Sequence, residues 1–244
     1  VPIREIPCND EVASLLSSFN SMIAIQTKMR DDLIEAEKLK QQLSLNLLQQ
    51  QVNPHFLYNT LDNICALAEL DEKETLIQLV MNLSSFYRSS LSNGKMHISI
   101  GQELEISRAY LEILQIRYFH KFDFTITCPE ALKNYSCIKL LLQPILENSI
   151  YHGIKGLDRH GILHIEAEDA GDCIRFTISD NGRGFSKEDY EKIWQQDADH
   201  FGIKSIQQRI LLYYGPGYGL SMESPQTGGC ITVITLPKQE GLPC

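Results

Sequence analysis

The chain has 244 residues and a net charge of −9, and 43% of its residues are apolar while 22% are charged. This composition is typical of a globular protein, which excludes a wholly disordered or collagen-like chain. The acid excess is spread along the chain without any basic block, which argues against nucleic acid as the main partner.

Residues 10–60 contain no glycine and a single proline, Pro54. Apolar residues recur there at alternating spacings of four and three, and this pattern favours a coiled coil. They are Val12, Leu15, Phe19, Met22, Met29, Leu33, Ala36, Leu43 and Leu47. The polar Gln26, Lys40 and Gln50 interrupt the seam, which weakens a coil but can fix its register. The alternative is a plain amphipathic helix in a globular core.

A second helix is predicted from about Lys73 to Leu91. Its apolar face consists of Leu76, Leu79, Val80, Leu83, Phe86 and Tyr87. Residues 71–74 place acid at its start, where the helix dipole favours negative charge, and Asn93-Gly94 is a stop signal. The two helices would form a hairpin that leaves an apolar stripe uncovered. Two copies would bury that stripe in a four-helix bundle.

After Gly94 the pattern changes to alternating helices and strands. Helices are predicted over residues 101–119, 137–152 and 202–214. Strands rich in Ile, Phe and Thr are predicted over residues 122–128, 161–168, 172–180, 219–224 and 230–236. Mixed elements with short turns indicate an α/β sandwich.

Seven cysteines are scattered along the chain, and no two have the C-x-x-C spacing of a zinc site, so they are interpreted as free thiols of a reducing compartment. The longest uncharged run, residues 41–61, contains five Gln, three Asn and one Pro, which is not the composition of a membrane span. No signal peptide is evident. Because the first residue is Val, we expect the chain to be a fragment of a longer protein.

The first candidate site is the run Gln-Val-Asn-Pro-His-Phe-Leu-Tyr-Asn-Thr over residues 51–60. Pro54 removes a backbone hydrogen bond, so a kink is expected there. His55 follows directly, and a neutral imidazole can act as a nucleophile near neutral pH. The alternative is a structural histidine on a helix.

The second candidate site lies in residues 143–153, where Glu147, Asn148 and His152 interrupt an apolar helix. Asn148 offers a carbonyl oxygen, which is the hard ligand that Mg²⁺ prefers. The alternative is a hydrogen-bonded helix asparagine without a ligand.

The third candidate site is Ser-Asp-Asn-Gly-Arg-Gly-Phe, residues 179–185, directly after a predicted strand. Asp180 could accept a hydrogen bond from an exocyclic amine, and Gly182 and Gly184 would let the backbone turn sharply and approach a ligand. The alternative is an ordinary turn.

Two further glycine sites follow. Residues 201–204, Phe-Gly-Ile-Lys, open the last helix, and Gly202 would expose free N–H groups suited to phosphate. Residues 227–229, Thr-Gly-Gly, stand between the last two strands and also fit a hairpin turn.

The order of these motifs resembles the N, G1, G2 and G3 boxes of the Bergerat ATP-binding fold. Histidine kinases share this fold with gyrase-type topoisomerases and the Hsp90 and MutL families. Residues 51–61 look like the phosphoacceptor box of YesM/LytS-type sensor histidine kinases, and Arg88 and Arg117 also match that family. Residues 9–22 resemble the second helix of a HAMP signal-relay module, in a weaker and partial match.

The resemblance implies an α+β protein, in which a coiled-coil and helical-hairpin dimerisation bundle precedes a Bergerat (GHKL-type) α/β sandwich. Residues 1–24 would be a partial HAMP helix and residues 25–95 the relay and dimerisation hairpin with the phosphoacceptor. Residues 96–244 would be the catalytic ATP-binding domain.

The resemblance also implies roles for single residues. His55 would be catalytic and accept the γ-phosphoryl group of ATP. The residues implied in nucleotide binding are Asn148, His152, Asp180, Gly182, Gly184, Gly202 and Ile203. Within this set Asn148 would hold Mg²⁺, and Asp180 would bind the adenine amine. Residues 185–201 would form the lid over ATP.

The implied partners are a second copy of the chain and the receiver domain of a response regulator, whose aspartate would take the phosphoryl group. The chain would be the cytoplasmic portion of a bacterial cell-membrane receptor, attached to the membrane through a segment that the sequence does not include. The alternatives are a Bergerat-fold ATPase that drives a conformational cycle and a non-catalytic nucleotide-binding relay. Pro144 opposes the ATPase, since no Glu stands four residues before Asn148 to activate water.

Three positions depart from the family pattern. Phe56 follows His55 where many histidine kinases have an acid, so the general base is unassigned between Asp62 and Glu147. His200 replaces the first glycine of the G2 box, and Cys230 replaces a common Thr.

Overall fold

The computed structural model describes residues 14–15, 17–32, 34, 54–90, 96–194, 201–226 and 228–240, and the chain divides into two units, residues 1–52 and 53–244. In the first unit the described residues between 14 and 34 are helical. Most of their apolar side chains are exposed, among them Leu15, Phe19, Met22 and Met29 of the predicted seam. The rest of the predicted coiled coil up to residue 53, and the start of the HAMP match, lie outside the described residues.

Two helices open the second unit as a hairpin, as the sequence predicted. Helix α2 spans Pro54–Glu69 and helix α3 spans Lys73–Ser90. Asp71 in the connection has a positive φ of 59°, a left-handed conformation that Asp tolerates in turns. The predicted kink at Pro54 depends on residues 51–53, which lie outside the described residues.

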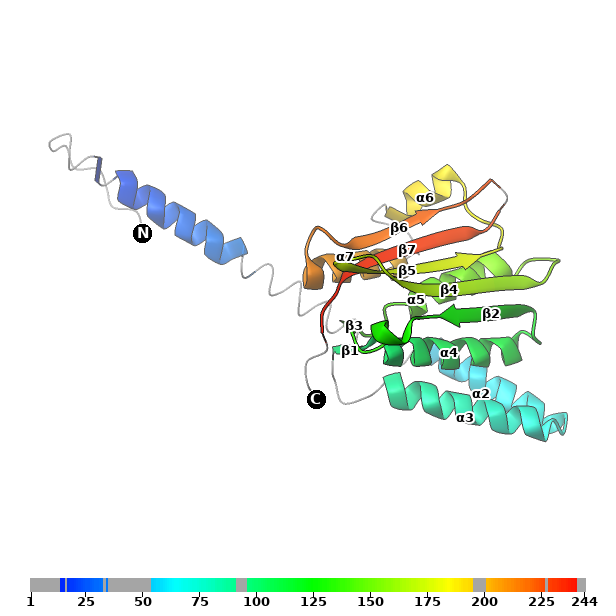
Figure 1. Ribbon diagram of the computed structural model, residues 1–244. Helices are drawn as coiled ribbons and strands as arrows, with labels where there is room; N and C mark the ends of the chain where they lie inside the picture. Colours follow the sequence, from blue (N-terminus) through cyan, green and yellow to red (C-terminus); the bar gives the residue numbers. More distant parts are fainter. Residues whose placement is uncertain are drawn as a thin grey trace. The chain divides into compact units, whose positions relative to one another are not determined.

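Helix α4, Ile100–Arg117, lies between the hairpin and strand β2 (Figure 1). Ser99 caps its start, because its side chain accepts from the N–H of Gln102 while the Gln102 side chain accepts from the N–H of Ser99. The apolar residues of α4 are distributed around the helix and do not form one stripe, which is the pattern of a helix buried on several sides.

A five-stranded sheet forms the body of the unit, in the order β2-β4-β5-β7-β6 (Figure 1). Its strands are β2 (Phe122–Thr127), β4 (Gly161–Asp169), β5 (Cys173–Asp180), β6 (Gly219–Glu223) and β7 (Cys230–Pro237). Strands β2 and β4 are parallel, and the other neighbours are antiparallel. The five strands confirm those predicted from the sequence, to within one residue at each end.

Shorter elements complete the fold. They are β1 (His97–Ser99), η2 (Glu130–Leu132), β3 (Ser136–Ile138), α5 (Gln143–Asn148), the π-helical turn η3 (Ser149–Ile154), α6 (Lys187–Trp194) and α7 (Phe201–Tyr214). None of the helices in the described ranges is long and apolar enough to cross a membrane. The result is an α+β protein, with helices first and an α/β sandwich after them.

One predicted element is wrong at its start. The sequence predicted a helix over residues 137–152, but residues 136–138 form β3 and pair with β1. Leu140 has a positive φ of 54°, which is incompatible with a right-handed helix, so α5 begins at Gln143. Strands of three residues carry too little periodicity to be recognised in a sequence.

Candidate functional site

A cavity of about 130 Å³ lies where β5 ends, between the α5–η3 segment and the elements that follow β5. Its lining consists of Ile145, Asn148, Ser149, His152, Gly153, Asp180, Arg183, Gly184, Phe185, Asp189, Ile203, Met222, Cys230 and Thr232. Apolar walls surround a few polar groups in this lining, which is the usual character of a small-molecule site.

Asp180, the last residue of β5, is one of two carboxylates that line this cavity, the other being Asp189. Burial raises its pKa above the ordinary value, because a charged carboxylate loses hydration inside the protein. Hydrogen bonds from the Ser149 side chain and from the backbone N–H groups of Gly182 and Cys230 oppose this shift. The N–H of Gly182 lies 2.9 Å from Oδ1 of Asp180. The carboxylate is therefore fixed in place and poorly hydrated.

Glycines permit the chain to pack tightly around Asp180. A Cβ on Gly182 would lie 2.6 Å from Oδ1 of Asp180 and 2.7 Å from Cα of Gly153. Gly229 has a φ of 87°, where other residues are strained, and a Cβ there would collide with the backbone oxygen of Asp180. Glycine is therefore needed next to Asp180 for steric reasons as well as for conformational ones.

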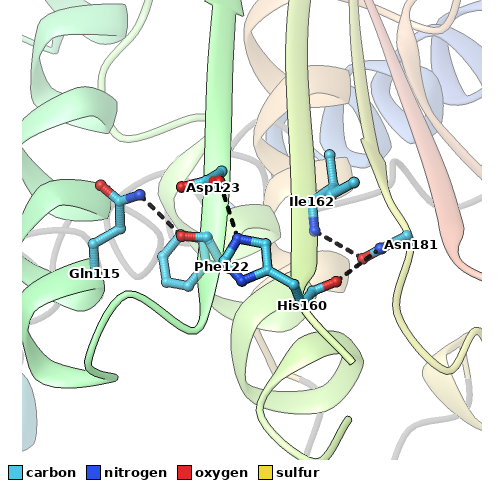
Figure 2. A network of polar contacts seen from close by, with 6 residues as sticks. All are labelled: Gln115, Phe122, Asp123, His160, Ile162 and Asn181. Atoms are coloured by element: carbon cyan, nitrogen blue, oxygen red, sulfur yellow. Dashed lines mark hydrogen bonds and ion pairs between the residues drawn. The ribbon is translucent and has the colours of Figure 1, made fainter. Parts of the chain in front are cut away.

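The loop after Asp180 is held from the side of β4 (Figure 2). Asn181 accepts from the N–H of Ile162 at 2.8 Å and donates from its side chain to the carbonyl of His160 at 3.1 Å. Nε2 of His160 in turn lies 3.0 Å from Oδ2 of Asp123 in β2. These contacts join the ends of three strands and fix the turn that carries Asp180.

Asn148 and His152 line the same cavity from the α5–η3 segment. Pro144 lies in the first turn of α5, where its missing N–H is harmless. The helix widens into a π-helical turn after Asn148, and such turns are frequent at functional sites. The N–H of Arg183 donates to the carbonyl of Gly153 at 3.1 Å, which ties this turn to the loop after Asp180.

A buried pair of charges positions the start of α5. Glu103 of α4 accepts from the N–H groups of Leu140 at 2.9 Å, Leu141 at 2.7 Å and Leu142 at 2.9 Å. Burial raises the pKa of Glu103, while these bonds and the Arg209 charge oppose the shift. Arg209 of α7 donates to the carbonyl of Leu140 at 3.1 Å and to that of Lys139. Both side chains thus hold the segment that leads into α5.

The segment expected to be a lid contains α6. Ser186 and Asp189 cap this helix reciprocally, since the Ser186 hydroxyl accepts from the N–H of Asp189 and the carboxylate accepts from the N–H of Ser186, both at 3.1 Å. The rings of Phe185, Tyr190 and Trp194 follow one another along its side. Residues 195–200, including His200, lie outside the described residues.

Helix α7 and strand β7 close the cavity. Gly202 is near the start of α7, and a Cβ there would lie 3.3 Å from Cβ of Pro144, so glycine permits this close approach to α5. Cys230 has its Sγ 3.6 Å from Oγ1 of Thr232. Burial raises the pKa of the Cys230 thiol to about 11, so it stays protonated at neutral pH.

His55 lies in the first turn of α2, with an exposed side chain. Its Nδ1 is 3.0 Å from Nδ2 of Asn59. The next residue, Phe56, is 2% exposed and packs, with tilted rings, against Phe86 of α3 and Tyr110 of α4. Among the described residues His55 is not part of the cavity lining.

Five of the seven residues expected at the nucleotide site line the cavity, namely Asn148, His152, Asp180, Gly184 and Ile203. Gly182 and Gly202 shape it without lining it. Sequence reasoning missed Asp189, Met222 and Thr232. The Ser186-x-x-Asp189 spacing could have signalled the helix cap that places Asp189, whereas Met222 and Thr232 are ordinary strand residues.

A metal ion would have few protein ligands here. Within the part of the chain that the structure describes, no group of three or more His, Cys, Asp or Glu could hold one. A single amide oxygen from Asn148 fits Mg²⁺, which in phosphate sites keeps waters and phosphate oxygens as its other ligands. The cysteines that the structure describes are free thiols: Cys65, Cys128, Cys137, Cys173 and Cys230.

Two family models match the chain. Residues 43–122 match the model described as histidine kinase, and residues 135–240 match the one described as histidine kinase-, DNA gyrase B-, and HSP90-like ATPase. The second match covers the cavity and the whole sheet except β2.

Curated relatives carry the same description. The sensor histidine kinase YesM of Bacillus subtilis is 31% identical over 228 residues, which are 93% of this chain and 39% of the relative. BtsS of Escherichia coli is 33% identical over 181 residues, or 74% of this chain and 31% of the relative. The chain therefore spans well under half the length of these relatives. A solved catalytic domain of the histidine kinase ThkA covers 59% of this chain and 97% of its own, with 16% identity and a TM-score of 0.47.

Proposed function

Because the chain belongs to the histidine kinase family, in its YesM/LytS-type branch of sensor kinases, we propose that it phosphorylates His55 from ATP and passes the phosphoryl group to an aspartate of a response regulator. The observation that carries the proposal is the partly buried Asp180 carboxylate in a cavity of the ATPase-like half, on the same chain as His55 in α2.

Adenine fits the chemistry of the cavity. Asp180 offers an acceptor for the exocyclic amine, and its poor hydration strengthens that hydrogen bond. Ile145, Ile203 and Met222 supply apolar surface for a flat ring. A base without an amine at this position would offer the carboxylate no donor in addition to Ser149, Gly182 and Cys230.

Asn148 is the residue proposed to hold Mg²⁺, which neutralises phosphate charge during phosphoryl transfer. Its position in the lining beside Ser149 and His152 supports this assignment. The free N–H groups near Gly202 at the start of α7 are proposed to bind phosphate oxygens, as helix starts commonly do.

The chemical step is a group transfer to a ring nitrogen of His55. A bond forms between that nitrogen and the γ-phosphorus, the bond from phosphorus to the β,γ-bridging oxygen breaks, and ADP leaves with the electron pair. The proton released from the ring goes to water. Since His55 does not line the cavity, transfer requires α2 and the nucleotide site to approach each other.

A homodimer is the proposed assembly. On α2 and α3 several large apolar side chains are 43–68% exposed: Tyr58, Leu61, Leu70, Ile77, Val80 and Met81. The described helical residues between 14 and 34 expose further large apolar side chains. A second copy would cover both. We also propose that the chain is the cytoplasmic portion of a bacterial membrane receptor, which the sensor kinases among its relatives support.

The test is to incubate the protein with γ-labelled ATP and Mg²⁺. Label that is acid-labile, alkali-stable and lost in His55→Ala supports the kinase. Steady phosphate release without labelled protein would instead identify an ATPase. Nucleotide binding with neither result would identify a non-catalytic relay.

A further inference from the structure

Among the described residues, the ring of His55 is contacted at one of its two nitrogens. Asn59 stands one helical turn further along α2, and its Nδ2 lies 3.0 Å from Nδ1 of His55. Side chains four residues apart on a helix are neighbours, so the contact follows from their spacing. It occupies Nδ1, while none of the residues that the structure describes bonds to Nε2, the ring nitrogen left for a reaction partner.

The backbone around this pair is held firmly. The Thr60 hydroxyl donates to the carbonyl of Phe56 at 2.7 Å, and the Asn63 side chain donates to the carbonyl of Asn59 at 2.9 Å. Phe56 itself is buried among aromatic rings. With the turn fixed, the remaining freedom of His55 is the rotation of its own side chain, and Asn59 restricts that rotation.

We propose that Asn59 is a positioning residue that occupies Nδ1 of His55 and so directs the phosphoryl group to Nε2. The part of this inference that concerns phosphorylation by ATP rests on the proposed function. The part that concerns the different accessibility of the two ring nitrogens is independent of it.

An amide suits this role because it offers both a donor and an acceptor. With its oxygen turned to the ring, Asn59 accepts from Nδ1–H and leaves the Nε2 lone pair free to attack phosphorus. As the Nε2–P bond forms and ADP departs with the electron pair, the Nδ1 proton passes to water. Nδ1 then holds a lone pair, to which the amide N–H donates after a half-turn. In the unphosphorylated structure Nδ2 also faces Nδ1, so the amide makes this half-turn once before the reaction, as the ring proton moves from Nε2 to Nδ1, and again after it.

The experiment identifies which nitrogen of His55 is phosphorylated. The protein is treated in one arm with ATP and Mg²⁺, and in a second arm with phosphoramidate, which phosphorylates histidine without any kinase activity. The two phosphohistidine isomers of the His55 peptide are then quantified by ³¹P NMR. Separating that peptide is necessary because the chain has seven histidines.

In the wild type we expect the Nε2 isomer to predominate in both arms. Asn59→Leu should lower the ratio of Nε2 to Nδ1 isomer by about two- to tenfold, the range of one modest hydrogen bond. Asn59→Asp should preserve the ratio, because a carboxylate still accepts from Nδ1–H. Gln78→Leu is the control, since it removes an exposed amide from the neighbouring helix α3 whose hydrogen bond is to Asn82 and not to the turn that carries His55, and it should leave the ratio unchanged.

The outcomes separate the two proposals. A predominant Nδ1 isomer in the wild type, or the same ratio in Asn59→Leu and wild type, would overturn the role of Asn59. Absence of phosphohistidine with ATP, together with Nε2 selectivity towards phosphoramidate that Asn59→Leu abolishes, would overturn the kinase function and leave the role of Asn59 in ring access standing.

Discussion

Phe56 of α2 stacks on Tyr110 of α4, with ring centroids 5.0 Å apart and planes tilted by 36°. Phe86 of α3 joins the pair, with its centroid 5.3 Å from that of Phe56. The residue directly after the proposed phosphoacceptor therefore belongs to the core shared by the hairpin and the sandwich. The position of His55 depends on this aromatic cluster.

Removing the ring of Phe56 should destabilise the second unit markedly. We expect Phe56→Ala to lower the free energy of unfolding by about 3–5 kcal/mol, because a fully buried aromatic side chain leaves a cavity. Tyr58→Ala, two residues along the same helix and 67% exposed, should change it by less than about 0.5 kcal/mol. Urea denaturation measures both, and similar losses for the two variants would contradict the packing described.

Asp180→Asn should weaken ATP binding by about ten- to hundredfold, since an amide replaces the charged acceptor for the adenine amine. The same variant should leave the thermal stability of the nucleotide-free protein unchanged or higher, because it removes a buried charge. Calorimetric titration with a non-hydrolysable ATP analogue and a thermal melt check the two halves. A melting temperature that falls with the affinity would indicate a structural role alone.

The raised pKa of Asp180 gives this site a pH dependence of known sign. A carboxyl group with a raised pKa in the folded state contributes stability that is fully present below its unfolded value of 3.8 and is lost as the pH rises through the folded value. Nucleotide binding needs the ionised acceptor, so on acidification the affinity should begin to fall at a higher pH than an aspartate with an ordinary pKa would allow. Asp180→Asn should flatten this dependence relative to the wild type.

Gly182→Ala should weaken nucleotide binding by at least about tenfold, although alanine adds no backbone strain at this position. The added Cβ meets Asp180 and the backbone of Gly153, so the carboxylate must move, and small displacements in a site have large effects. Gly156→Ala is the control, since no heavy atom lies within 4 Å of a Cβ there. The fluorescence of the single tryptophan, Trp194, can report binding, and equal affinity in both variants would refute the steric argument.

Arg209→Leu should lower the free energy of unfolding by about 3–5 kcal/mol, because it leaves Glu103 without its neighbouring cation and two backbone carbonyls without donors. Arg175→Leu removes a cation from a half-exposed pair with Glu168 at 2.8 Å, and its effect should stay within about 1 kcal/mol. Comparing the two by urea denaturation isolates the effect of burial. The prediction fails if the exposed pair matters as much as the buried one.

Much of the fold was predictable because its signals are local. The strands of the main sheet alternate apolar and polar residues, and helix α3 carries an apolar stripe, so their predicted bounds were close. Asp180 and its glycines were predictable for the same reason, since a turn that approaches a ligand needs glycine at fixed offsets.

Other features depend on contacts between distant segments. Glu103 and Arg209 look like ordinary charged residues of solvated helix faces, and only the fold brings both to the segment 139–142. For the same reason the sequence predicted that helix α5 would begin six residues too early. Phe56 could be seen as a departure from the common pattern after His55, but its burial against Tyr110 could not.

The central place of β5 in the sheet has a consequence for the two sides of the cavity. Strand β5 is paired on both edges, with β4 and with β7, and Asp180 is bonded at its end. Helix α6 on the opposite side has eight residues and a capping box. Amide protons near Asp180 should therefore exchange with solvent only when the whole unit unfolds, whereas those of α6 exchange through local opening. Asp180, the proposed adenine ligand, would thus lie in a part of the unit that opens far less often than α6, the helix of the proposed lid.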